Sequence, residues 1–173
     1  GPESLGVNNE FATGKLFLID NDGQVTEVAS DVRLSNGLAF SPDGHTLYHS
    51  DSLRRTVFKY SVNPNGTLGE KAPFARVRQG GPDGLAVAED GTVWVALAGG
   101  GHGVSVFNPD GTEIEFIKIS EPLCTSLCFG GDDLKTLYIV SGSEGASSDK
   151  AGSIYRMRID VAGVPVRDAL VNL

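Results

Sequence analysis

Two oxygen-bearing side chains occupy the same position in a repeated motif. Asn36 lies in "SNGLAF" and Asp83 lies in "PDGLAV", while the third copy, "CTSLCF", has Thr125 there. Amide and carboxylate oxygens are donors that Ca²⁺, Mg²⁺ and Mn²⁺ prefer, and Zn²⁺ also accepts them. The motif position, defined by these three residues, therefore indicates a divalent-cation site, with turn capping as the alternative role for the asparagine and the aspartate.

The elements that must position these side chains are short β-strands. Each copy of the motif begins with an apolar strand, turns through "SPDG", "AEDG" or "GGDD", and continues with "TLY", "TVW" or "TLY". Glycine and aspartate suit the tight turns of hairpins. A third strand follows as "TVFKYSV", "GVSVFNP" or "GSIYRMRI", and a weaker fourth strand is expected around residues 74–77, 113–119 and 164–166.

Four strands repeated about every 42 to 47 residues are typical of the blades of a β-propeller. We therefore predict an all-β fold, and a β-propeller in preference to a sandwich or a barrel. Upstream of the first motif, two strands at 15–20 and 24–29 would form the outer half of a blade. The predicted organisation is one partial propeller domain over residues 1–173, with about three and a half four-stranded blades: the half-blade at 1–30 and blades at 31–78, 79–120 and 121–173.

An incomplete ring leaves strand edges and apolar faces uncovered at its first and last blades. Propellers close with four to eight blades, more than this sequence supplies. We therefore expect either a fragment of a longer protein or a chain that closes against a partner. A second chain that completes the propeller is the candidate partner.

The composition argues against two classes of partner. The formal net charge of −8 repels phosphate backbones, so nucleic-acid binding is not expected. No apolar run approaches the roughly 20 residues of a membrane helix, and no charged-then-apolar leader is visible. Cys124 and Cys128, four residues apart on one strand, are expected to share a face and to be buried, reduced and structural. Reduced thiols favour a cytoplasmic location.

The repeated segments resemble a known family. "SNGLAFSPDGHTLYHSDS", "GGPDGLAVAEDGTVWVALAGG" and "TSLCFGGDDLKTLYIVSG" are similar, in this order, to the senescence-marker-protein, regucalcin and gluconolactonase family. The resemblance covers nearly the whole chain. It implies a six-bladed propeller that holds one divalent metal ion near the mouth of its central channel and hydrolyses lactones of aldonic acids.

The resemblance also assigns residues. The family's metal-ligand asparagine falls on Asn36, and its metal-ligand aspartate, which is also the general base, falls on Asp83. A third ligand, a glutamate of the family's first blade, has no counterpart in this sequence. A glutamate that faces substrate in some members matches Glu3 by its spacing to "GKLFLID".

For several other residues a purely structural role is the alternative to a functional one. His102, in the loop "AGGGHGV", would lie beside the channel mouth and is a candidate for substrate binding. The glycines around it could cradle phosphate, but no helix follows to support an anion. Asp51 and Ser52, the pair "DS" at the end of a second strand, are expected to bond the backbone of the neighbouring blade or to join the polar surroundings of the site. His49 is predicted to be packed, and Trp94 to lie between blades.

The predicted function is that of a metal-dependent hydrolase that opens a sugar lactone to its hydroxy acid. The metal, Ca²⁺ or else Zn²⁺, Mn²⁺ or Mg²⁺, would polarise the lactone carbonyl while Asp83 removes a proton from water. Two alternatives stay open. One is a non-catalytic calcium-binding or scaffold propeller, and the other is a truncated chain that is inactive without its first blades.

Overall fold

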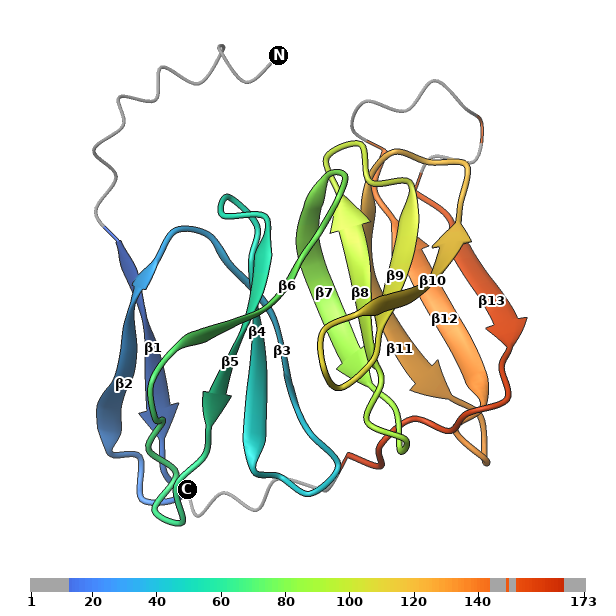
Figure 1. Ribbon diagram of the computed structural model, residues 1–173. Coiled ribbons are helices and arrows are strands. Elements are labelled where there is room, and N and C mark those ends of the chain that lie inside the picture. Colours follow the sequence, from blue (N-terminus) through green and yellow to red (C-terminus); the bar gives the residue numbers. More distant parts are fainter. Residues whose placement is uncertain (1–12, 144–148, 150–151, 167–173) are drawn as a thin grey trace.

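The computed structural model describes residues 13–143, 149 and 152–166, and this part of the chain is built from β-strands. Figure 1 shows four antiparallel sheets side by side in chain order, from the blue pair β1–β2 to the orange and red strands β11–β13. Each sheet is a run of hairpins, as short strands joined by tight turns require. No helix long and apolar enough to cross a bilayer occurs among these residues.

The first two sheets follow the predicted pattern. The first is a single hairpin that corresponds to the predicted half-blade, and the second is a four-stranded meander with the order β3-β4-β5-β6. The strands are β1 (Gly14–Ile19), β2 (Val25–Val32), β3 (Ser35–Phe40), β4 (Thr46–Asp51), β5 (Thr56–Ser61) and β6 (Ala72–Arg76).

The third sheet repeats the four-stranded meander, whereas the fourth sheet has three strands in the described residues. Their strands are β7 (Gly81–Val87), β8 (Val93–Ala98), β9 (Gly103–Phe107), β10 (Glu113–Lys118), β11 (Cys124–Gly130), β12 (Thr136–Ser141) and β13 (Ile154–Arg158). The all-β partial propeller predicted from the repeat is therefore the observed architecture, with the first strand of each full meander on the inner side.

The fourth strand expected at 164–166 is wrong. After β13 the chain returns to the preceding sheet, where Gly163 forms a bridge with Ala88 and the Val164 N–H donates to the Val87 carbonyl at 3.1 Å. Gly163 lies against Phe129, so closely that a Cβ on Gly163 would stand 2.3 Å from the Phe129 Cβ. The backbone bonds to Val87 and Ala88 and the packing on Phe129 of β11 therefore prevail over pairing with β13.

Apolar side chains fill the three spaces between neighbouring sheets. Leu16 and Val32 meet Leu47 and Tyr60 in the first space, and larger clusters fill the other two. Trp94 of β8 contacts Phe129 of β11 with ring centroids 5.5 Å apart, which confirms the predicted packing between blades. Each sheet is therefore buried on the faces that it shares with its neighbours, and the core consists of three apolar layers, one between each pair of neighbouring sheets.

The two outer sheets expose apolar side chains, as expected for an unclosed ring. On the first sheet Ile19 is 67% exposed, with Phe17 and Val25 also in solvent. On the last sheet Ile154 is 73% exposed and Met157 is also accessible. The sheets that carry them, β1–β2 and β11–β13, lie at the two ends of the row of sheets in Figure 1.

Both cysteines are free thiols, but they do not share an environment. Cys124 is buried and Cys128 is exposed, so the expectation that both are buried on one face is wrong. The physical reason is a β-bulge in β11 between Cys124 and Ser126, which adds one residue and reverses the alternation of faces beyond it.

We predict that Gly37→Ala destabilises the chain by about 1 to 3 kcal/mol, because the inner strands β3 and β7 approach one another at this residue. A Cβ on Gly37 would stand 2.5 Å from both the Asp83 carbonyl oxygen and the Leu85 nitrogen, and these backbone atoms cannot move aside easily. Urea unfolding followed by circular dichroism measures the effect.

Gly14→Ala is the matched control for this substitution. Its Cβ would meet the Val32 oxygen at 3.4 Å, an ordinary contact, so no loss of stability is expected. Equal unfolding midpoints for the two variants would show that the contact between β3 and β7 is not a tight one.

Candidate functional site

The motif position coincides with a β-bulge in all three inner strands. The register shifts between Ser35 and Leu38 in β3, between Pro82 and Leu85 in β7, and between Cys124 and Ser126 in β11. In each case the inner strand carries one residue more than its partner. Such a bulge turns a side chain out of the regular alternation of the strand, and bulges recur beside active sites. Asn36, Asp83 and Thr125 owe their orientation to these bulges.

The structure brings Asn36 and Asp83 together, although they belong to different sheets and are separated by 47 residues, 83 minus 36. The Asn36 side chain is close enough to the Asp83 carboxylate to lower its pKa. The Asn36 Nδ2 also donates to the Ser52 Oγ at 3.2 Å. An amide and a carboxylate from neighbouring blades thus face the same space at one end of the inner strands.

Burial raises the pKa of the Asp83 carboxyl, and the hydrogen bonds from the Asn36 side chain and the Gly84 N–H lower it in part. Asp83 is half-buried and forms no ion pair with any residue that the structure describes. A carboxylate in this state has lost part of its hydration without gaining a countercharge. A cation or a proton at this carboxylate would relieve that cost.

Thr125 contributes differently from the other two members of the motif position. Its hydroxyl donates to the Val140 carbonyl at 3.3 Å, within its own sheet. The residue after it is Ser126, and a Cβ on Gly84 of the neighbouring strand would stand 2.4 Å from the Ser126 Oγ. In this structure Thr125 is therefore engaged in the sheet, and the polar pair consists of Asn36 and Asp83.

The donor set of this pair fits a hard divalent cation in part. The Asn36 and Asp83 oxygens are suitable ligands, but Ca²⁺ takes six to eight oxygens and Mg²⁺ about six. Among the described residues there is no group of three or more histidine, cysteine, aspartate and glutamate side chains that could hold a metal ion. Further ligands would therefore come from water, from substrate or from protein outside the described residues.

Of the two residues predicted to bind substrate, the structure describes one. His102 lies in the loop between β8 and β9, at the same end of the sheet as Asp83, because Gly81 pairs with Ala98. It is half-buried with a φ of 56°, and no hydrogen bond joins it to Asp83 in the described part of the chain. Glu3 lies outside the described residues.

Ser52 and His49 support the site from strand β4 and its end. The Ser52 hydroxyl donates to the Pro82 carbonyl of the next blade at 2.7 Å, which confirms the predicted bond to the neighbouring backbone. The predicted packed role of His49 is also confirmed, because it is 1% exposed and its Nε2 lies 3.0 Å from the Ser35 Oγ. Burial lowers the pKa of His49, so the neutral ring is favoured.

Sequence reasoning missed the contact between Ser52 and Asn36, and missed what Asp51 does. Asp51 is 1% exposed and accepts hydrogen bonds from the Arg33 and Leu34 N–H groups at 2.9 and 3.1 Å. It therefore fixes the chain just before the motif position. The predicted antiparallel hairpin places the end of β4 opposite the start of β3, but the register and the bulge that bring these side chains together could not be read from the sequence.

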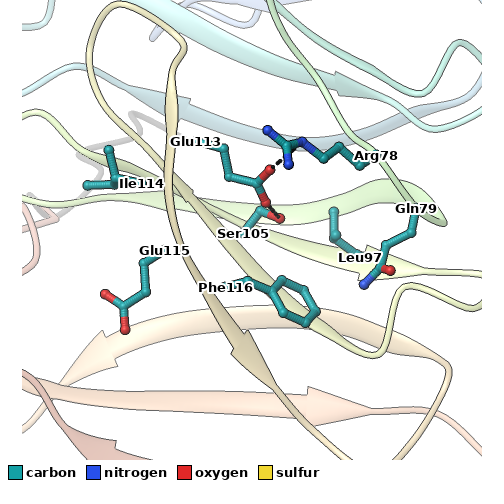
Figure 2. A pocket seen from close by; sticks show the side chains of 8 residues that line it. All are labelled: Arg78, Gln79, Leu97, Ser105, Glu113, Ile114, Glu115 and Phe116. Carbon is teal, nitrogen blue, oxygen red and sulfur yellow. Dashed lines mark hydrogen bonds and ion pairs between the residues drawn. The ribbon is translucent and has the colours of Figure 1, made fainter.

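Two cavities lie away from the pair. Figure 2 shows one of about 400 Å³, in which the Glu113 carboxylate accepts from the Ser105 Oγ at 2.7 Å and pairs with the Arg78 Nε at 3.2 Å. The Gln79 side chain is likewise bonded, to the Gly101 carbonyl at 2.7 Å. A second, more apolar cavity of about 710 Å³ lies at the other end of the inner strands and is lined by Leu38, Leu85, Leu127 and Val164 among others.

The sheets and the polar pair define an all-β partial propeller. Its candidate cation site lies at the end of the inner strands where Asn36 and Asp83 meet. Residues 3–143 match the family described as the SMP-30/Gluconolactonase/LRE-like region. This match covers most of the chain, and the chain therefore belongs to this family, as its repeated motifs predicted.

Two proteins with assigned names are similar to this chain over most of its length. The chain is 36% identical to the 6-deoxy-6-sulfogluconolactonase of Pseudomonas putida, over 87% of this chain and 54% of that protein. It is 32% identical to the pentonolactonase XacC of Haloferax volcanii, over 91% of this chain and 58% of that protein. The chain thus spans little more than half the length of these curated relatives.

Solved structures agree with the fold. A luciferin-regenerating enzyme has a TM-score of 0.80 and 30% identity, with 90% of this chain and 56% of that chain covered. A calcium-binding protein, regucalcin from Agrobacterium tumefaciens, also has a TM-score of 0.80, at 24% identity, with 95% and 58% covered. Each of them extends well beyond the part that this chain matches.

We predict that Asp83→Asn makes the metal-free chain more stable at pH 7.5, by about 0.5 to 1 kcal/mol. Because burial raises the pKa of Asp83 in the folded chain, folding favours the protonated carboxyl, and this contribution is lost as pH rises through the folded pKa. The amide of the substituted asparagine does not ionise, so the variant does not lose this stability as pH rises. The gain should disappear near pH 3, where the carboxyl is protonated in both states. Urea unfolding in EDTA at the two pH values measures it.

Asp43→Asn provides the control of opposite sign. A hydrogen bond from Ser41 lowers the pKa of Asp43, so its ionised form favours folding and its neutralisation should reduce stability at pH 7.5. If Asp83→Asn were destabilising in the same way at pH 7.5, the burial penalty on Asp83 would be refuted.

Proposed function

We propose that this chain supplies part of the active site of a metal-dependent hydrolase that opens a sugar lactone to the hydroxy acid. The observation that carries the proposal is the convergence of Asn36 and Asp83 from neighbouring blades. The names of the relatives support the choice of substrate, because two of them are named for hydrolysis of sugar lactones. The proposal concerns the complete protein, of which this chain is a part by comparison with those relatives.

In this mechanism Asp83 is the general base. Water adds to the lactone carbonyl carbon while the Asp83 carboxylate takes one of its protons. The ring C–O bond then breaks, and the proton is returned to the departing ring oxygen to give the hydroxy acid. The raised pKa of Asp83 favours this role, because a carboxylate that binds a proton more readily is a better base.

Asn36 and Asp83 would hold one divalent cation, for which Ca²⁺ is the first candidate and Zn²⁺, Mn²⁺ and Mg²⁺ are alternatives. When bound, such an ion stabilises the negative charge that develops on the carbonyl oxygen. The Asn36 oxygen is a neutral donor, so it adds a ligand without neutralising the ion. We assign substrate contacts to His102, at the same end of the sheet, and to Glu3.

The matching catalytic test uses Asp83→Ala in the ring-complete protein. We expect kcat for an aldonolactone such as gluconolactone to fall by at least about 100-fold, because the base is lost. Released acid is followed with a pH indicator. EDTA should abolish the wild-type rate, and added Ca²⁺, Mn²⁺, Zn²⁺ or Mg²⁺ should restore it.

Asp110→Ala is the control variant, since this exposed aspartate bonds only within the turn between β9 and β10. Full activity of Asp83→Ala would remove Asp83 from the mechanism. A wild-type rate that is unaffected by EDTA would contradict the metal requirement, and metal binding without turnover would favour the non-catalytic calcium-binding or scaffold alternative.

The apolar side chains exposed on the two outer sheets support the view that other protein covers both faces in the complete molecule. We propose that further blades provide it, either within a longer chain or from a second chain that completes the ring. Light scattering of this 173-residue chain distinguishes the two, because a dimer is expected only in the second case. The free thiols of Cys124 and Cys128 support a reducing compartment such as the cytoplasm.

A further inference from the structure

A short chain of hydrogen bonds links the two members of the candidate site through Ser52. The Asn36 Nδ2 and the Ser52 Oγ are 3.2 Å apart, and the Ser52 Oγ and the Pro82 carbonyl oxygen are 2.7 Å apart. Pro82 directly precedes Asp83. The hydroxyl therefore connects the asparagine of one blade to the backbone that carries the aspartate of the next.

The chemistry of the three groups fixes the direction of this chain. A serine hydroxyl has one proton to donate, and a carbonyl oxygen can only accept. The proton of Ser52 is therefore used on Pro82, so Ser52 can act only as an acceptor toward Asn36. The Asn36 amide must then present its nitrogen, and not its oxygen, to Ser52.

The Asp83 carboxylate favours the same orientation of the amide. When ionised it can only accept, and the Asn36 side chain is close enough to lower its pKa, so Nδ2 and not Oδ1 is the suitable neighbour. With Nδ2 directed to Ser52, the Oδ1 atom has no protein hydrogen-bond partner among the described residues. This oxygen is the atom that a cation or a substrate hydroxyl can use.

We propose that Ser52 is a positioning residue that sets the orientation of the Asn36 amide and thereby leaves Oδ1 free as a ligand. The inference deepens the proposed function and rests on it for the identity of the ligand. It assigns to Ser52 a role beyond the joining of two blades, because the direction of a hydrogen bond, and not only its presence, determines which atom of Asn36 faces the site.

The backbone of Ser52 is held well enough to impose this orientation. Its N–H donates to the Leu34 carbonyl at 3.0 Å, and its carbonyl accepts from the Arg55 N–H at 3.1 Å. On the side of the next blade, a Cβ on Gly81 would stand 2.9 Å from the Ser52 oxygen, so the two backbones are close. Asp51, the residue before Ser52, is 1% exposed and is held by hydrogen bonds from the Arg33 and Leu34 N–H groups.

The test compares Ser52→Ala with the wild-type chain by ¹H–¹⁵N NMR in the absence of metal. The side-chain NH₂ signals of Asn36 are assigned by their loss in Asn36→Asp. In Ser52→Ala one Nδ2 proton should move upfield and exchange with water about tenfold faster, the value for one lost hydrogen bond. Ser52→Thr, which keeps a hydroxyl, should restore the wild-type signals.

Ser41→Ala is the matched control, because Ser41 also uses its hydroxyl in β-hairpin hydrogen bonds but lies at the other end of β3. It should leave the Asn36 signals unchanged. Dispersed backbone spectra confirm that each variant is folded. Unchanged Asn36 signals in Ser52→Ala would overturn the proposal.

A Ca²⁺ titration of the same samples separates this inference from the proposed function. Ser52→Ala should weaken Ca²⁺ binding about tenfold, as loss of a group that orients a ligand does. Equal Ca²⁺ affinity in Ser52→Ala and wild type would overturn the positioning role. If neither chain bound Ca²⁺, Mn²⁺ or Zn²⁺ while the Asn36 signals still depended on Ser52, the metal assignment would fail and the orientation of the amide would stand.

Discussion

The inner strands of neighbouring sheets approach one another through glycine, and this contact determines where both members of the polar pair lie. A Cβ on Gly37 would overlap the backbone of β7, and one on Gly84 would overlap Ser126 of β11. At such separations a side chain on one inner strand can reach its counterpart on the next. The Ser52–Pro82 hydrogen bond then adds a directed polar link where the glycines allow close packing.

The bulges complete this arrangement. A regular strand would send Asn36 and Asp83 to the face set by strict alternation, whereas the extra residue in β3 and in β7 changes that direction at the same point of each repeat. Asp51 holds the chain just before the first of these bulges, because it accepts hydrogen bonds from the Arg33 and Leu34 N–H groups. The geometry of the site is therefore fixed by the bulge of the repeat and by the buried carboxylate beside it.

The repeat could be read from the sequence because strand alternation and turn residues are local signals. They identified the order of the sheets and the motif position of Asn36 and Asp83. Features that depend on contacts distant in sequence could not be found in this way. The exposure of Cys128 follows from a bulge, and the return of Gly163 to Ala88 follows from packing on Phe129. The contact between Ser52 and Asn36 needed the register of β3 and β4.

The return of the chain at Gly163 and Val164 also affects cooperativity. In a row of repeats each unit gains stability mainly from its immediate neighbours, so a row unfolds from its ends. The third and fourth sheets share both a packed interface and the strand-like bridge from Gly163 to Ala88. In the described part of the chain the hairpin β1–β2 packs on one neighbouring sheet, through Leu16 and Val32. For this chain in isolation we therefore expect the hairpin β1–β2 to open more readily than the two C-terminal sheets, which are expected to open as one unit.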